Sequence, residues 1–378
     1  MSTASSSLLS NTLFVNSNVV LPVKFPIVKI STERFRHERR FDTNNHVPLI
    51  NDIFMNEVAI KVNIGTPSQE YTLLFDTGSS DIWVPSFTCS PETGCPEFLH
   101  RYDPKNSSTY HAFNDTQTIH LNYTIGRAEG EYFEDLLSLQ GLTILHQVMG
   151  MMNKIEGPIS DQMKTKDRNH SSTIIMDGIF GAGFSSGTMR AINDNLPYEP
   201  FIPALYKSGK IPGPLFSVLL PPHSAEEGSI VLGGIHDFVK TILYTSVVGH
   251  SLENGDKQYT HWLVEMKAYE LATSITNNTY YYSTNHAPDM FKVDCHLFES
   301  PNRVNFYFPS SFDRQEKEIK VPIAIKDLIA KRESDHQCFL LILPSPDNRN
   351  FILGNMFLRH FVTVFDFKKI NHELDFLL

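Results

Sequence analysis

A single carboxylate between two apolar runs constrains the fold of this chain more than any other feature. Asp76 follows the run Tyr71–Phe75, and after Thr77 and Gly78 the chain becomes apolar again at Ile82–Pro85. Two such runs joined by a turn that contains glycine predict two β-strands with the carboxylate presented where they meet. An aspartate in a turn can also serve only as a backbone cap, so Asp76 is at this point a candidate and no more.

Short apolar runs rich in Val, Ile, Phe and Tyr recur along the whole chain, punctuated by Gly, Pro, Asn and Ser. Few windows show the 3.6-residue period of a helix, so the chain is expected to be mainly β. Short helices are predicted at Ile202–Ser208 and Ile325–Lys331, and the polar stretch 150–172 is expected to be a surface insertion. Strands are predicted at Val58–Ile64, Tyr71–Phe75, Ile119–Tyr123, Phe216–Leu220, Ser229–Leu232, Trp262–Met266 and Phe361–Phe365.

Composition excludes several classes of function. The 378 residues are enough for two domains, and a net charge of −10 argues against a nucleic-acid partner or an anionic membrane surface. No apolar run approaches the roughly 18 residues of a membrane span. The 16 histidines lack a His-Glu-x-x-His arrangement and the cysteines lack a Cys-x-x-Cys arrangement, so neither a metal nor another cofactor is expected.

The cysteines and glycosylation sequons bear on the compartment. Cys89, Cys95, Cys295 and Cys338 allow three pairings, of which neighbour pairing is the simplest, and four reduced core thiols are the alternative. Sequons and disulfides together favour a secreted protein or one in the lumen of the secretory pathway or vacuole, although Met1–Val23 shows no clear signal peptide. The glycosylation candidates are Asn106, Asn114, Asn122, Asn169 and Asn277.

Motifs along residues 52 to 378 together resemble the pepsin family of aspartic proteases. They surround the Asp-Thr-Gly run at Asp76, and the chain also carries a pair of apolar-apolar-Gly segments that resemble the family's two psi-loop strands. Pairs Cys89–Cys95 and Cys295–Cys338 fit the disulfides of that family. The motifs are Val62–Pro67, Arg101–Pro104, Asn106–Tyr110, Gly178–Gly181, Leu215–Val218, Gly228–Gly234 and Phe351–Leu358.

The resemblance implies residue roles. Asp76 would be one of two catalytic aspartates, with Thr77 fixing its loop, Gly78 allowing the turn and Ser79 hydrogen-bonding the carboxylate. In the flap, Tyr123 would cover the substrate with Trp83 as its hydrogen-bond partner. Ile125 would line the cleft with Leu74, Phe75 and Ile82, which implies apolar side chains on either side of the scissile bond.

The implied fold is mainly β and bilobed, with a cleft between two β lobes. Residues 1–51 would be a basic propeptide-like segment, 52–221 the N-terminal lobe and 222–378 the C-terminal lobe. The implied activity is that of an aspartic-type endopeptidase, in which an aspartate activates water to hydrolyse a peptide bond. Its partners would be polypeptide substrates in extended conformation and pepstatin-type inhibitors, and the protein would be a monomer.

The second catalytic loop has no counterpart in this sequence, so the C-terminal lobe is expected to be incomplete. Asp-Thr-Gly occurs once and Asp-Ser-Gly does not occur. Recruitment of Asp289 or Asp294, or a homodimer with two Asp76 loops, would supply a second carboxylate, but neither aspartate precedes a glycine turn. Left alone, Asp76 is expected to be ionised. A damaged gene model, a splice variant and an inactive peptide-binding pseudoprotease all remain open.

Residues 1–45 carry a net charge of +3 against −13 for the remainder. This segment is expected to cover the cleft as a propeptide, with Arg39-Arg40 as a processing site, and a solvated tail is the alternative. A further motif, Gly183–Gly187, fits the Gly-x-Ser-x-Gly elbow of serine hydrolases around Ser185. That motif overlaps the psi-loop region, which argues against a serine hydrolase.

Overall fold

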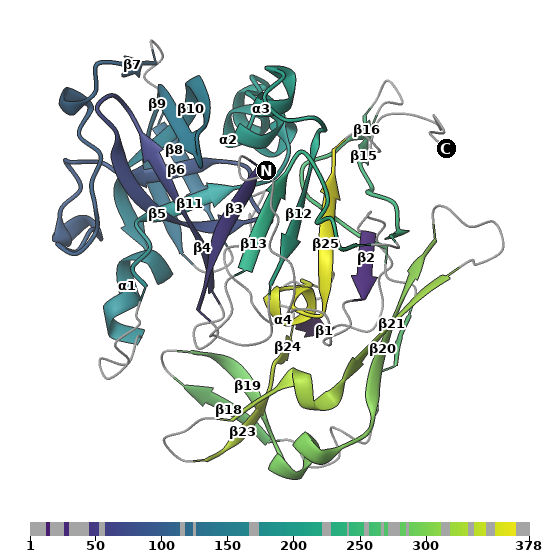
Figure 1. Cartoon of the computed structure of the whole chain (residues 1–378). Helices are drawn as coiled ribbons and strands as arrows, with labels where there is room; N and C mark the ends of the chain where they lie inside the picture. Colours follow the sequence, from purple (N-terminus) through teal and green to yellow (C-terminus); the bar gives the residue numbers. More distant parts are fainter. Residues whose placement is uncertain are drawn as a thin grey trace.

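The computed structural model of the chain describes most of the sequence (Figure 1). Within the described residues strands predominate and helices are short, which confirms the mainly β prediction. The described residues are 13–15, 26–29, 45–52, 57–113, 118–123, 126–165, 174–220, 228–239, 242–252, 257–265, 268–270, 280–284, 287–310, 318–331, 336–344 and 352–367.

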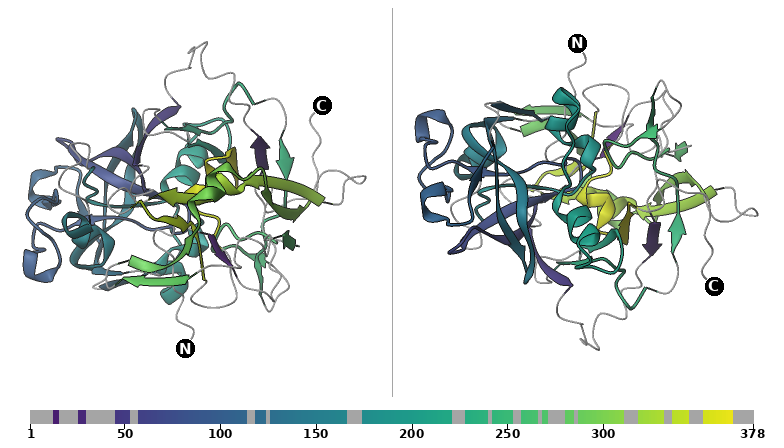
Figure 2. Two further views of the ribbon diagram at one scale, coloured as in Figure 1. Left: turned by 90° about the horizontal axis from the view of Figure 1, so that it is seen from below. Right: turned by 90° about the horizontal axis from the view of Figure 1, so that it is seen from above.

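One 14-stranded sheet runs through the molecule in the order β14-β2-β25-β12-β13-β3-β4-β5-β11-β6-β10-β9-β7, with β8 paired to β9. Figures 1 and 2 show its two ends in different lobes, with β12, β13 and β25 between them. The first lobe is drawn in purple to teal and most of the second in green to yellow. The two-lobed arrangement agrees with the prediction.

The first lobe holds the strands on either side of Asp76. Side chains alternate between core and solvent along β8, whereas β6 and β11 are buried throughout. The alternating sequence of β8 therefore matches a strand with one solvent face, and the apolar sequences of β6 and β11 match strands buried on both faces. The elements are β3 His46–Asp52, β4 Glu57–Ile64, β5 Gln69–Asp76, β6 Ile82–Pro85, η2 Pro91–Thr93, η3 Pro104–Asn106, β7 His111–Ala112, β8 Thr118–Asn122, β9 Arg127–Leu139, β10 Leu142–Glu156, α1 Pro158–Thr165, β11 Gly178–Gly181, η4 Ser185–Gly187, α2 Met189–Asp194 and α3 Phe201–Lys207.

The second lobe adds smaller sheets to the far end of the large one. Two of these have the orders β17-β20-β21 and β18-β19-β23-β22. The elements are β1 Leu13–Val15, β2 Pro26–Lys29, β12 Leu215–Leu219, β13 Gly228–Leu232, β14 Leu243–Tyr244, β15 His250–Ser251, β16 Lys257–Gln258, β17 Ala268–Glu270, β18 Tyr280–Thr284, β19 Ala287–Val293, η6 Cys295–Glu299, β20 Arg303–Pro309, β21 Glu318–Ala324, η7 Ile325–Leu328, β22 Ile329–Lys331, β23 Cys338–Leu340, β24 Ile342–Pro344, α4 Asn355–Leu358 and β25 Phe361–Asp366.

Three of the predicted elements are wrong. Residues 262–265 form no strand, because Trp262 is buried in an aromatic cluster and its Nε1 donates to Ala182 O at 3.0 Å. The helix expected at Ile325–Lys331 is a 3-10 turn followed by β22, because β22 pairs with β23. Residues 150–156 are not an insertion but the end of β10, whose Met152 and Ile155 lie in the core.

The expected psi-loop strand at Ile352–Gly354 is also absent. These three residues lie outside any strand, and the helix α4 begins directly after them. Its counterpart in the first lobe, Gly178–Gly181, forms β11 as predicted. The two lobes therefore differ at the place where a second catalytic loop would be threaded.

The N-terminal region supplies strands to the second half of the large sheet. β2 pairs antiparallel with β25 and β14 in that sheet, whereas β1 pairs parallel with β24 in a separate two-stranded sheet. β3 pairs with both β4 and β13 and buries Val47 and Leu49. The expected boundary between residues 51 and 52 falls inside β3, and the one after residue 221 lies outside the described residues.

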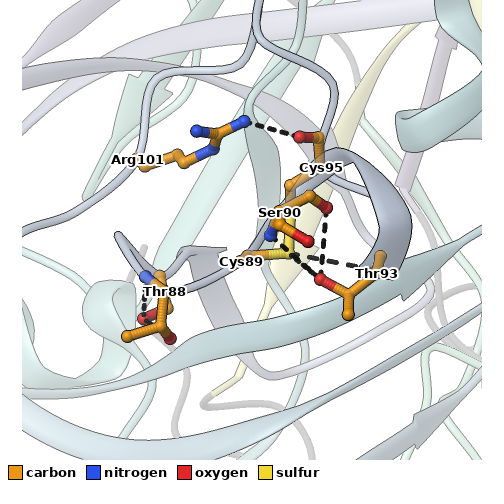
Figure 3. Close-up of a disulfide and its surroundings, with 7 residues drawn as sticks. Thr88, Cys89, Ser90, Thr93, Cys95 and Arg101 are labelled. Atoms are coloured by element: carbon orange, nitrogen blue, oxygen red, sulfur yellow. Dashed lines mark hydrogen bonds between the residues drawn. A yellow bond between two sulfur atoms is a disulfide. The ribbon is translucent and has the colours of Figure 1, made fainter.

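Both disulfides join neighbouring cysteines, as predicted. Cys89–Cys95 closes a short loop around η2, and Figure 3 shows the Arg101 guanidinium donating to Cys95 O, at 2.6 Å. The Thr93 hydroxyl accepts from Ser90 N at 3.0 Å and so caps the same loop. Cys295–Cys338 ties η6 to β23 in the second lobe.

The two disulfides are predicted to contribute unequally to stability. Their cysteines are 6 and 43 residues apart, so removing the second bridge frees far more unfolded-chain entropy. We expect the Cys295→Ala/Cys338→Ala variant to lose about 4 kcal/mol and the Cys89→Ala/Cys95→Ala variant about 2 kcal/mol. Urea denaturation of the two variants checks this, and equal losses would contradict the entropic argument.

Candidate active site

Asp76 is the last residue of β5, at the point where the strand gives way to a turn. Asp76 as a whole is half-buried, and its carboxylate accepts two hydrogen bonds from its own loop: Gly78 N donates to Oδ1 at 2.8 Å and Ser79 Oγ donates to Oδ2 at 2.6 Å. Thr77 lies between them and is also partly exposed. The loop therefore holds both carboxylate oxygens in a fixed orientation.

The Asp76 loop is anchored by β11, which runs between β5 and β6. β11 is parallel to β5, with Gly181 opposite Asp76, and antiparallel to β6. Ala182 N donates to Asp76 O at 2.8 Å. A Cβ atom at Gly181 would lie 2.5 Å from the carbonyl carbon of Ser80, so only glycine allows this close passage.

Burial raises the pKa of Asp76 from its ordinary 3.8 to about 6, while the hydrogen bonds from Ser79 and Gly78 act in the opposite direction. The carboxyl group is then neutral in acid and ionised at neutral pH. The expectation that a lone Asp76 is ionised therefore holds only above about pH 6. A group that titrates in this range suits acid-base chemistry in mild acid.

Tyr123 and Trp83 are joined as the resemblance implied. Trp83 Nε1 donates to the Tyr123 hydroxyl at 2.6 Å, and both side chains are buried. Tyr123 N donates to Gly126 O at 3.0 Å, which closes the turn between β8 and β9. Gly126 has a φ of +99°, and a Cβ there would lie 2.4 Å from Glu156 O. Ile125 lies outside the described residues.

The sequence reasoning overlooked Asp81, which is almost fully buried five residues after Asp76. Its Oδ1 accepts from the hydroxyls of Tyr198, at 2.7 Å, and Tyr132, at 3.1 Å. Met189 N at the start of α2 donates to its Oδ2 at 3.0 Å. Burial raises the pKa of Asp81, and these three bonds oppose the shift. Its burial could have been predicted from its position, because Asp81 directly precedes the apolar run Ile82–Pro85.

Other predicted residues have different surroundings. Leu74 and Ile82 are fully buried in the core, so they do not line an open cleft as expected. Asp294 caps η6 by accepting from His296 N at 2.9 Å, so its carboxylate has a structural partner. The side chain of Asp289 is outside the described residues. Among the candidate sequons, Asn106 and Asn122 are exposed and the other three are outside the described residues.

The surroundings of Ser185 do not match a nucleophile elbow. Ser185 begins η4, a 3-10 turn, rather than standing between a strand and a longer helix. The neighbouring Ser186 Oγ donates to Tyr259 O at 2.5 Å, and a Cβ at Gly187 would lie 2.2 Å from Thr260 O. The motif's glycines are therefore explained by tight packing. Among the described residues, no group of His, Cys, Asp and Glu side chains is arranged to hold a metal ion.

Comparison with known proteins fits this geometry. The family described as eukaryotic aspartyl protease matches residues 57–284 and 272–375. The chain belongs to that family. It is 31% identical over 357 residues to mucorpepsin of Rhizomucor miehei, covering 87% of this chain and 80% of that protein. Mucorpepsin of Rhizomucor pusillus is 29% identical over 362 residues with the same coverage. Pepsin B of Canis lupus familiaris is 26% identical over 333 residues, which cover 81% of this chain and 77% of that protein.

The Asp76 carboxyl is predicted to make stability depend on pH. The fold disfavours the ionised form of Asp76. The resulting loss of folding stability is absent below about pH 4, where the carboxyl is protonated in both folded and unfolded states, and complete above about pH 6, where it is ionised in both. We expect Asp76→Asn to be equal to the parent near pH 4 and more stable near pH 7, by on the order of 2 to 3 kcal/mol. Urea denaturation across this range tests the difference, with Asp194→Asn on the exposed end of α2 as control. A pH-independent difference would contradict it.

The Trp83–Tyr123 hydrogen bond gives a second stability prediction. Tyr123→Phe leaves the buried Trp83 N–H without its acceptor, so we expect a loss of about 1 to 3 kcal/mol. Tyr206→Phe, at an exposed position on α3, is the matched control and should change little. A Tyr123→Phe variant as stable as the control would show that the bond carries no net stability.

Proposed function

We propose that this protein is an aspartic-type endopeptidase that binds a polypeptide in extended conformation and uses Asp76 to activate the attacking water. The observation that carries the proposal is the Asp76 loop: the carboxylate of a half-buried aspartate, oriented by Gly78 and Ser79 and held by the threaded strand β11. When ionised, Asp76 takes a proton from water as the water adds to the peptide carbonyl. Tyr123 lies on the hairpin proposed to cover the bound peptide.

Family members with a complete site use two aspartates, and this chain supplies one of them. A second carboxylate protonates the carbonyl oxygen and shares a proton with the first. Its absence removes acid assistance worth about 10² to 10⁴ in rate. The family match also divides into two stretches that overlap at residues 272–284, in the region where the second loop is expected. We therefore propose that the C-terminal lobe lacks that loop and that hydrolysis by this chain is slow.

A second candidate function is binding of peptides without hydrolysis. Residues 352–354 favour it, because they form no strand where the first lobe has β11. The pKa of about 6 favours it too, since a lone Asp76 is mostly protonated well below pH 6 and cannot act there as a base. A protonated carboxyl beside Ser79 still donates a hydrogen bond to a peptide carbonyl, so binding survives where catalysis does not.

The N-terminal segment is proposed to be a propeptide that ends before β3. Cleavage after Arg40 would leave β3 whole, and with it the pairing to β4 and β13. We also propose a secreted or luminal compartment, because the two disulfides suit an oxidising environment, and a monomer, as the family resemblance implies. None of the helices that the structure describes is long and apolar enough to cross a membrane.

The two functions are separated by measuring binding and turnover on the same preparation. The chain beginning at Phe41 is assayed near pH 6, where part of Asp76 is ionised, with an unfolded protein substrate and with a labelled pepstatin-type inhibitor. We expect inhibitor binding that weakens in Asp76→Ala, together with turnover that is slow and inhibitor-sensitive. Binding without any turnover would support the second candidate. Absence of both would exclude a functional site at Asp76.

Restoring the second loop is predicted to restore the rate. A chimera that takes the segment between residues 266 and 295 from Rhizomucor miehei mucorpepsin should hydrolyse the same substrate at least about 10² times faster than the parent chain. Resequencing the transcript across these residues shows whether the natural message carries such a segment. A folded chimera that binds the inhibitor but is no faster would contradict the single-carboxylate explanation.

A further inference from the structure

The flap hairpin has two faces of opposite character. Along β8 the side chains alternate strictly: Ile119 and Leu121 are buried, while Thr118, His120 and Asn122 are exposed. The next residue is Tyr123, which points inward to Trp83. Asn122 therefore stands on the solvent face of the hairpin, next in sequence to the tyrosine proposed to cover the substrate.

A polar row crosses three strands on this solvent face. Asn122 is opposite Arg127 in the β8–β9 ladder, and Arg127 is opposite Glu156 in the β9–β10 ladder. The Arg127 guanidinium donates to Glu156 Oε1 at 2.6 Å, and the two side chains remain 48% and 44% exposed. Directly opposite residues of an antiparallel pair share a face, so a group attached to Asn122 would lie over this ion pair.

The sequence around Asn122 is an acceptor for N-linked glycosylation. Asn122-Tyr123-Thr124 has the required Asn-x-Thr order, and the flap tyrosine is its middle residue. The acceptor is exposed, so the folded protein has room for a glycan there. The paired disulfides are independent evidence for the secretory route on which this modification occurs.

We propose that Asn122 carries an N-linked glycan that covers the outer face of the flap hairpin and protects it from proteolysis. The glycan is transferred from a lipid-linked oligosaccharide diphosphate. The sugar C1 bonds to Asn122 Nδ2 and breaks its bond to the diphosphate oxygen, while the amide loses one proton. No oxidation or reduction is involved.

The protection follows from what lies under the glycan. Exposed hairpin turns are preferred sites of proteolytic nicking, and Arg127 is an exposed residue one strand from the acceptor. Because Tyr123 faces the opposite side, the glycan leaves the peptide-binding face open. The glycan site itself does not depend on hydrolysis, but the name flap rests on the proposed function above.

Asn106 provides a matched control sequon. It ends η3, and Tyr102 just before η3 stacks on Phe133 of β9 at a ring distance of 4.6 Å. Arg127 begins that strand, about 20 Å from Phe133 at the rise of an extended chain. A glycan at Asn106 would therefore leave Arg127 uncovered.

The test uses the full chain expressed in a eukaryotic secretory host. Peptide mass spectrometry after enzymatic glycan release identifies Asn122 by its conversion to Asp. Limited digestion with trypsin then measures the cutting rate at the Arg127–Ala128 bond. We expect Asn122→Gln, Thr124→Ala and the enzymatically deglycosylated parent all to be cut there severalfold faster than the glycosylated parent, and Asn106→Gln to match the parent.

Each arm can overturn the proposal. A secreted protein glycosylated at Asn106 but not at Asn122 would exclude the site. Equal cutting at Arg127 in the glycosylated and deglycosylated parent, which share one folded chain, would exclude protection. Binding of a labelled pepstatin-type inhibitor is measured alongside and should be unchanged by glycan removal. Loss of inhibitor binding in every form would count against the proposed function and leave the glycan result intact.

Discussion

The passage of β11 between β5 and β6 is the constraint on which the rest of the first lobe depends. A parallel neighbour for β5 can come only from a distant part of the chain, and Gly178–Gly181 arrives more than a hundred residues later to supply it. Its backbone satisfies the inner edges of both strands, and Ala182 N pairs with Asp76 O. The catalytic candidate is therefore fixed through its backbone as well as by Gly78 and Ser79.

The second lobe differs from the first at the position that corresponds to β11. Residues 352–354 remain irregular although their Ile-Leu-Gly sequence is that of a buried strand. Trp262 packs instead with Phe184, at a ring distance of 4.3 Å, and with Phe367, at 4.7 Å, across the junction between the lobes. Apolar contact holds the lobes together there, whereas a second carboxylate would need a strand-bounded turn to aim it.

The buried polar groups of the first lobe explain why its geometry is well defined. Asp81 is held by two tyrosine hydroxyls and the backbone of α2, and Asp177 accepts from Thr72 N at 3.0 Å and His100 N at 2.7 Å. A buried carboxylate is costly unless its oxygens are bonded, so each network allows one arrangement of the strands around it. Asp81 in particular ties the segment that follows the Asp76 loop to α2.

Sequence alone determined much of this protein, because several of its signals are local. Asp76 in its glycine turn, the strands with clear alternation and the Cys89–Cys95 bridge all depend on residues close together in the chain. Contacts between residues far apart in the chain could not be predicted from the sequence. Contacts with residues far along the chain decided three features: the pairing of β22 with β23, the absence of a strand at residues 262–265, and the burial of Asp81. Tertiary structure alone set the pKa of Asp76 and placed Asn122 and Tyr123 on opposite faces of one hairpin, because burial and strand pairing are properties of the packed lobes.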